Sequence, residues 1–136
     1  MSTAQPGIFA LGTASHAYLE LDAAAGVANS ELVTMIASLR EPRTTMGGVN
    51  LVAGFRPELW RSVEPDRAPP DVASFDQPVV GLGGYELPAT QHDIVIWLSG
   101  SGYDVVFDLS RTVVMALSPL APRRCPSGRR PAVSNA

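Results

Sequence analysis

The sequence predicts a single α+β domain that extends over residues 1–120. Three observations support this prediction. Short segments alternate apolar and polar residues, two longer segments carry an apolar stripe at helical spacing, and glycine- and proline-rich turns separate them. With 136 residues, of which 46% are hydrophobic and 17% charged, the chain can bury a core and differs from a disordered protein.

The first half of the chain predicts a strand, a helix and a second strand. Apolar and polar residues alternate in His16–Leu21, which is typical of a strand with one buried face. Asn29 or Ser30 is a suitable N-cap for the helix, and Pro42 ends it. The second strand is Val49–Phe55. The apolar stripe of the helix consists of Leu32, Val33, Ile36 and Leu39.

The second half predicts a short helix, a long loop, a strand and a long helix. Pro57 is placed as the first residue of the short helix, and Glu64–Gly84 is a surface loop rich in proline, glycine and aspartate. Asp93–Leu98 is the most apolar segment, so we expect a strand covered on both faces. Tyr103–Leu117 is the long helix, with a stripe formed by Val105, Val106, Leu109, Val113, Ala116 and Leu117.

This order of elements supplies all but the last strand of a split βαβ, or ferredoxin-like, domain. The segment that follows the long helix, Ala121–Ala136, is rich in arginine and proline, and proline cannot donate to a sheet ladder. We expect a disordered tail there, with a composition like that of a GC-rich gene translated out of frame. Without the last strand, part of the stripe formed by Leu109, Val113 and Leu117 should be uncovered, and the protein should be marginally stable.

Charge and composition limit the partners and the compartment. All ten basic residues are arginines, and four lie in Ala121–Ala136, which leaves six against 13 acidic residues in the body. An acidic body argues against nucleic acid binding; the four arginines of the tail form a solvated end or bind a polyanion. No apolar run reaches the length of a membrane span. Cys125 is the only cysteine and no signal-peptide pattern opens the chain, so a cytoplasmic protein is expected.

Two histidines are candidates for metal, haem or acid–base chemistry. His16 and His92 each lie at the start of a predicted strand, and neither has histidine, cysteine or glutamate partners at ligand spacing. A structural role beside the strand is the preferred interpretation of both. His92 and Asp93 could form an acid–base pair, but adjacent strand residues point to opposite faces, which weakens this hypothesis.

Other segments lack the residues that their chemistry would need. Gly81–Gly84 does not open a helix after a strand, so it is no phosphate cradle. Ser99–Gly102 links a strand to a helix but has no Walker lysine, and we interpret it as a connector. Cys125 is interpreted as an exposed thiol without a function. The sequence therefore predicts no catalytic, cofactor-binding or metal-binding residue in this chain.

Several segments together resemble the N-terminal half of the dye-decolorizing (DyP-type) haem peroxidases. The most specific is Pro88–Ile94, P-A-T-Q-H-D-I, which is similar to the P-x-T-Q-x-D entry into a strand in that family. The other similar segments are Gln5–Ile8, the strand of His16–Leu21, Gly48–Phe55, Pro57–Trp60 and the helix of Tyr103–Leu117. The resemblance covers most of Gln5–Leu120. It implies one of the two ferredoxin-like domains of a peroxidase that oxidises organic donors with hydrogen peroxide through haem.

The resemblance also implies catalytic residues that this sequence does not contain. In the family, a strand after the second helix leads into a Gly-Phe-x-Asp-Gly-Thr motif with a distal aspartate, and the haem-ligating histidine and distal arginine follow later. None of these has a counterpart here. Haem is therefore expected in the full-length family, with no specific binding by this chain.

Two functions of different class remain open. In the first, the chain is the N-terminal part of a DyP-type peroxidase, cut short by a frameshift or stop and catalytically inactive. In the second, it is a solitary ferredoxin-like module that binds a partner or its own copy. An uncovered sheet edge invites pairing with another chain, so a homo-oligomer through that edge is the expected partner interaction.

Overall fold

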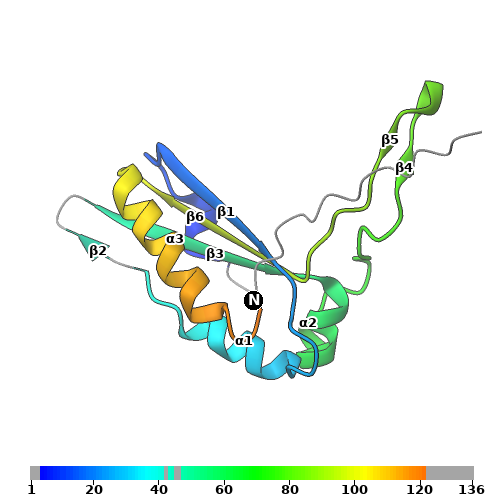
Figure 1. Cartoon of the computed structure of the whole chain (residues 1–136), viewed down its shortest axis with the longest axis horizontal. Coiled ribbons are helices and arrows are strands. Elements are labelled where there is room, and N and C mark those ends of the chain that lie inside the picture. The colour runs from blue at the N-terminus through cyan, green and yellow to red at the C-terminus, as the bar shows by residue number, and fades with distance from the viewer. Residues whose placement is uncertain (1–3, 42, 45–46, 122–136) are drawn as a thin grey trace, which may run out of the picture.

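A computed structural model describes residues 4–41, 43–44 and 47–121. It contains three α-helices, six strands and three 3-10 turns (η) within this part of the chain, shown in Figure 1. In chain order they are η1 (Pro6–Phe9), β1 (Ser15–Leu21), α1 (Asn29–Ser38), β2 (Arg43–Thr44), β3 (Gly47–Phe55), α2 (Pro57–Val63), η2 (Pro65–Arg67), β4 (Val79–Val80), η3 (Leu82–Gly84), β5 (Glu86–Leu87), β6 (Ile94–Gly100) and α3 (Tyr103–Leu117).

The main sheet has the strand order β1-β6-β3-β2. Strand β6 pairs antiparallel with β1 on one side and with β3 on the other, so β1 and β3 run parallel to each other. Helix α1 forms the crossover between them, and β6, which follows them in sequence, is inserted between β1 and β3. The predicted α+β class is confirmed, and the strands and helices lie close to their predicted positions.

Helices α1 and α3 cover one face of this sheet, and the core lies between the helices and the sheet (Figure 1). The alternation predicted for the first strand is confirmed, since Leu19 and Leu21 are buried and Tyr18 and Glu20 are exposed. The buried core consists of Leu19, Leu21, Leu32, Ile36, Val49, Leu59, Ile94, Ile96, Leu98, Val106, Leu109, Val113, Leu117 and Ala121.

The expectation that the strand at Asp93–Leu98 is covered on both faces is wrong. Strand β6 buries Ile94, Ile96 and Leu98 under the helices, whereas Val95 on the opposite face is 41% exposed. The prediction came from an uninterrupted apolar run, which is typical of a strand with two covered faces. Here apolar residues also occupy the face that no described helix covers. We call this second surface the open face of the sheet.

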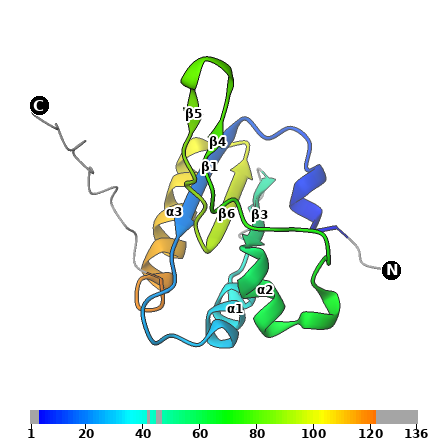
Figure 2. The same cartoon turned by 90° about the vertical axis from the view of Figure 1, so that its right-hand side faces the viewer.

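The N-terminal turn η1 packs against the open face beside β3. Figure 2 shows it on the side of the sheet opposite to α3. Gly7 is buried there, and a Cβ atom at this position would come within 2.8 Å of the Val52 Cγ2 atom and 3.1 Å of the Asn50 Cβ atom. Only glycine therefore permits this close approach. Over β1 and β6 the open face is partly exposed, with Tyr18 65% and Val95 41% exposed.

Helix α1 begins differently from the prediction. Asn29 and Ser30 lie within its first turn, and the N-cap residue is Ala28, whose side chain offers no acceptor. The Asn29 amide nitrogen instead donates to the Ser62 hydroxyl of α2 at 2.7 Å. A tertiary contact thus uses the polar side chain that local sequence assigned to the cap. Pro42, predicted to end the helix, lies outside the described residues; the helix ends at Ser38.

The long loop predicted at Glu64–Gly84 is partly regular. Strands β4 and β5 form a two-stranded hairpin that projects away from the main sheet, as Figures 1 and 2 show. Its tip is η3, where Gly83 and Gly84 have positive φ angles of 76° and 81°. The glycines of this segment therefore serve a tight turn. We call residues 76–90 the arm.

The prediction that the α3 stripe is partly uncovered is also wrong. Leu109, Val113 and Leu117 are 9%, 1% and 0% exposed, because α3 lies over β1 and β6. The exposed apolar side chains of this helix are on its flank, where Phe107 is 47% and Met115 71% exposed. The tail predicted at residues 121–136 lies outside the described residues except for Ala121, which is buried.

Candidate functional site

A cluster of charged side chains ties together the ends of three strands. His92, which directly precedes β6, places its Nδ1 atom 3.1 Å from the Asp22 Oδ1 atom after β1. The same carboxylate oxygen accepts from the Asp93 backbone N–H at 3.4 Å. The His92 Nε2 atom lies 3.7 Å from the Glu20 carboxylate. Both nitrogens of the ring are therefore close to carboxylates of the β1 end of the sheet.

Asp93 completes this connection on its other side. Its carboxylate accepts from the Ala23 backbone N–H at 2.9 Å and lies 3.1 Å from the Arg56 guanidinium. The backbone N–H of Arg56 also donates to the carbonyl of Asp93 at 2.8 Å. The Asp93 side chain is 18% exposed, so this ion pair is partly shielded from water. Asp93 joins the end of β1, the start of β6 and the end of β3.

His92 and Asp93 do not form an acid–base pair with each other. Each uses its side chain in a different contact, His92 with Asp22 and Asp93 with Ala23 and Arg56. Asp22, the shared partner, was not predicted. It lies about seventy positions from His92 in the sequence, and the pairing of β1 with β6 brings the two residues together. This arrangement links the strand ends, and His92 also lines a cavity of about 390 Å³ together with Glu20 and Arg56.

His16 lies on the open face of the sheet among aromatic side chains. Its Nδ1 atom accepts from the Trp97 indole N–H at 3.2 Å, and the two rings stack with centroids 5.9 Å apart. Tyr18 also stacks on Trp97, with ring centroids 6.1 Å apart. The indole bond fixes the ring of His16 and occupies one of its nitrogens. A structural role is thus supported for this histidine as well.

The remaining candidates have no ligand-binding geometry of their own. Gly81–Gly84 is the tip of the arm, and Ser99–Gly102 is the connector from β6 to α3, as predicted. Cys125 lies outside the described residues. No group of three or more histidine, cysteine, aspartate or glutamate side chains in the described ranges could hold a metal ion.

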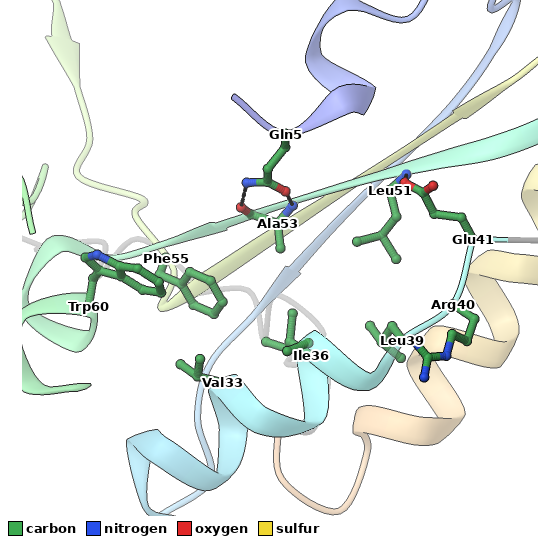
Figure 3. Close-up of a pocket in the computed structure, with 11 residues that line it drawn as sticks. Gln5, Val33, Ile36, Leu39, Arg40, Glu41, Leu51, Ala53, Phe55 and Trp60 are labelled. Carbon is green, nitrogen blue, oxygen red and sulfur yellow. Dashed lines mark hydrogen bonds between the residues drawn. The ribbon is translucent and has the colours of Figure 1, made fainter. Parts of the chain in front are cut away.

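A cavity of about 620 Å³ lies between α1 and β3 (Figure 3). Phe55 and Trp60, stacked with centroids 5.3 Å apart, form one wall, and Arg40 and Glu41 lie at the other end. The rest of the lining consists of Gln5, Val33, Ile36, Ala37, Leu39, Leu51 and Ala53. No histidine, cysteine or tyrosine lines this cavity, so it offers no axial ligand to a haem iron.

Two side chains close the outer edge of β3 above this cavity. The Gln5 amide donates to the Ala53 carbonyl at 2.7 Å and accepts from the Ala53 N–H at 2.9 Å, as Figure 3 shows. The Glu41 carboxylate accepts from the Leu51 N–H at 3.1 Å. Gln5 therefore replaces one residue of a neighbouring strand. This role of Gln5 was not predicted, because a glutamine before a turn carries no local signal of pairing with a strand edge.

A further polar contact connects α2 to the segment that leads into the arm. The Ser74 hydroxyl donates to the Glu58 carboxylate, and this hydrogen bond is the main cause that lowers the pKa of Glu58. Arg56 and Arg61 nearby lower the pKa of this carboxyl further. The contact holds the chain in place after the short helix and carries no chemistry by itself.

Comparison with known proteins gives a match at the level of structure only. No protein-family model matches the sequence. No curated protein matches it either.

Solved structures of dye-decolorizing peroxidases match the fold. A haem-bound variant of DypB from Rhodococcus jostii superposes with a TM-score of 0.70, at 22% sequence identity over 86% of this chain. A DyP-type peroxidase protein from Shewanella oneidensis gives 0.62 at 19% identity over 89%, and a dye-decolorizing peroxidase from Bacteroides thetaiotaomicron gives 0.55 at 14% over 78%. The chain has the fold of part of a DyP-type peroxidase.

The match covers only part of the solved proteins. This chain spans 39%, 40% and 36% of the three structures, in the order given above. The resemblance stated from the sequence is thus supported at the level of the fold.

Among the described helices, none is both long and apolar enough to span a bilayer.

Proposed function

We propose that the chain is the N-terminal part of a DyP-type haem peroxidase and that it has no peroxidase activity of its own. The observation that carries the proposal is the fold match, which covers most of this chain but about two fifths of each solved peroxidase. The P-x-T-Q-x-D segment at Pro88–Asp93 supports it independently, because in this structure its aspartate joins three strand ends.

The strand order supports a split βαβ sheet whose last strand is not among the described residues. The Leu120 carbonyl accepts from the Ala24 N–H at 2.8 Å, just after β1, and Ala121 is buried at this point. The chain therefore leaves α3 beside the outer edge of β1. A strand continuing from there would run antiparallel to β1 through a crossover of the usual hand.

The described residues do not fit a haem group. The cavity between α1 and β3 lacks an axial ligand, the Nδ1 atom of His16 accepts from the Trp97 indole, and the two ring nitrogens of His92 lie beside Asp22 and Glu20. We therefore propose that haem belongs to the complete peroxidase and that this part contributes a scaffold. We place the protein in the cytoplasm, since one cysteine allows no intrachain disulfide.

Two measurements test this proposal. Sequencing the coding DNA past codon 120 and translating all frames should yield Gly-Phe-x-Asp-Gly-Thr followed by a histidine codon. Titration of the purified chain with haemin should give no saturable one-to-one Soret shift and no peroxide-dependent dye oxidation. A stoichiometric haem complex with peroxidase turnover would contradict inactivity, and the lack of any such frame would contradict the peroxidase assignment.

A second candidate function is a self-associating module, and the free outer edge of β1 favours it. In the part of the chain that the structure describes, no strand pairs with this edge, whereas Gln5, Glu41 and β2 cover the edge of β3. Oligomeric state in solution distinguishes this candidate from an inert monomer.

A further inference from the structure

We propose that β1 is the interface of a two-fold symmetric dimer, in which β1 pairs antiparallel with β1 of a second copy of this chain. The inference deepens the second candidate function and rests on it. It is carried by the direction of the backbone groups of β1, by the self-complementary order of its side chains and by an apolar groove beside it.

The backbone groups of β1 that face outward can be identified from the opposite edge of the sheet. Leu51 and Ala53 of β3 direct their N–H groups away from β6, toward Glu41 and Gln5. In an antiparallel ladder, alternate residues point to alternate sides. Following the two registers across β6, the residues of β1 whose N–H and C=O groups point outward are His16, Tyr18 and Glu20.

Strand β1 lacks most of the features that protect natural sheet edges, although it carries the charged Glu20. It pairs with β6 over all seven residues without a bulge, and it contains neither proline nor lysine. A long regular edge of this kind is a template for strand pairing. Within residues 4–41, 43–44 and 47–121, Gln5 and Glu41 protect the β3 edge and no strand pairs with the outer edge of β1.

The sequence of β1 is complementary to itself in one register. If all seven residues pair around a two-fold axis at Tyr18, His16 lies opposite Glu20 of the second copy, and Glu20 lies opposite its His16. The two Tyr18 rings then face each other on the open face. On the helix side Ala17 lies opposite Leu19, a small residue against a large one.

The surface on the helix side of β1 is apolar. A groove of about 250 Å³ runs between β1 and α3 and is lined by Leu19, Phe107, Ser110, Arg111, Val114 and Met115. In the dimer the α3 helices of the two copies lie on the same side of the joined sheet. The exposed Phe107 and Met115 flank would then be covered by the second copy.

Sedimentation velocity of the full chain under reducing conditions tests the dimer. We expect the wild type to dimerise, and H16D and E20R each to raise the dimer dissociation constant about tenfold, since each replaces two favourable cross-strand pairs per dimer. An equimolar mixture of H16D and E20R should regain dimerisation, because Asp at 16 then faces Arg at 20. A37E, at an exposed position of α1 outside β1 and its neighbouring groove, is the control and should dimerise like the wild type.

One further variant excludes a folding artefact, because H16D also removes the acceptor of the Trp97 indole. H16R places a permanent cation opposite Glu20 and should tighten the dimer, a gain that unfolding cannot produce. A monomeric wild type, a mixture that stays monomeric, or an A37E variant that dissociates would overturn the proposal. Any of these results would leave the peroxidase assignment unaffected, since that assignment depends on the gene and on the fold match.

Discussion

At the scale of single residues, Asp93 is the polar side chain on which the arrangement of the main sheet depends most. Its carboxylate accepts from Ala23 after β1 and pairs with Arg56 after β3, and its own residue leads into β6. A partly buried carboxylate with two such partners contributes more than a surface ion pair. Asp93 is the aspartate of the segment that resembles P-x-T-Q-x-D, and its contacts give a structural reason for an aspartate at this position.

The variant D93A should lower the free energy of unfolding by about 2 kcal/mol, because it leaves the Ala23 N–H and Arg56 without their acceptor. D93N should cost less, since an amide oxygen can still accept from Ala23. Urea unfolding measures both. D71A, at an exposed position outside the regular elements, is the control and should change little. Equal losses in D93A and D93N would contradict a role for the backbone hydrogen bond.

The variant S74A should raise the pKa of Glu58 toward its ordinary value, because the Ser74 hydroxyl is the main cause of its lowering. A carboxyl with a lowered pKa in the folded state stabilises that state above its unfolded pKa, and the effect disappears as pH falls through the folded value. S74A should therefore weaken the dependence of the free energy of unfolding on pH in the acid range. NMR titration of the Glu58 side chain measures the pKa directly; no change would exclude the hydrogen bond in solution.

At the scale of elements, the turn η1 acts as a partial strand for the edge of β3. The variant Q5A should accelerate hydrogen exchange of the Ala53 amide, which loses its acceptor. The Leu51 amide, held by Glu41, provides an internal control and should exchange as before. Heteronuclear NMR resolves both sites. Equal acceleration at Leu51 would indicate general loosening of the strand instead of a local cap.

The elements also show what sequence could predict. Alternation in β1 and the stripes of α1 and α3 correctly indicated the buried faces, because burial on one side imposes a period on the sequence. The open face was not predicted, since Val95 and Trp97 are apolar without being covered by a helix. The Asp22–His92 and Gln5–Ala53 contacts were missed because they join segments that are far apart in sequence and carry no local signal.

At the scale of the whole molecule, folding and association should be linked. If β1 pairs with a second copy, the folded state is stabilised by mass action, and the melting temperature should rise with protein concentration. Calorimetry over a hundredfold range of concentration measures this effect. The variant H16D should show a weaker dependence than the wild type. A melting temperature that is independent of concentration in both proteins would contradict the linkage.

The arm has a consequence for how this domain could be divided. A projecting hairpin with exposed tips is a preferred site of proteolytic cleavage, and Leu82 at the tip is fully exposed. A cut there would separate a piece carrying β1, α1 and β3 from one carrying β6 and α3. Because β6 is inserted between β1 and β3, each piece holds what the other needs for its core. The domain is thus built as two complementary halves, which suits it to reconstitution from separately made chains.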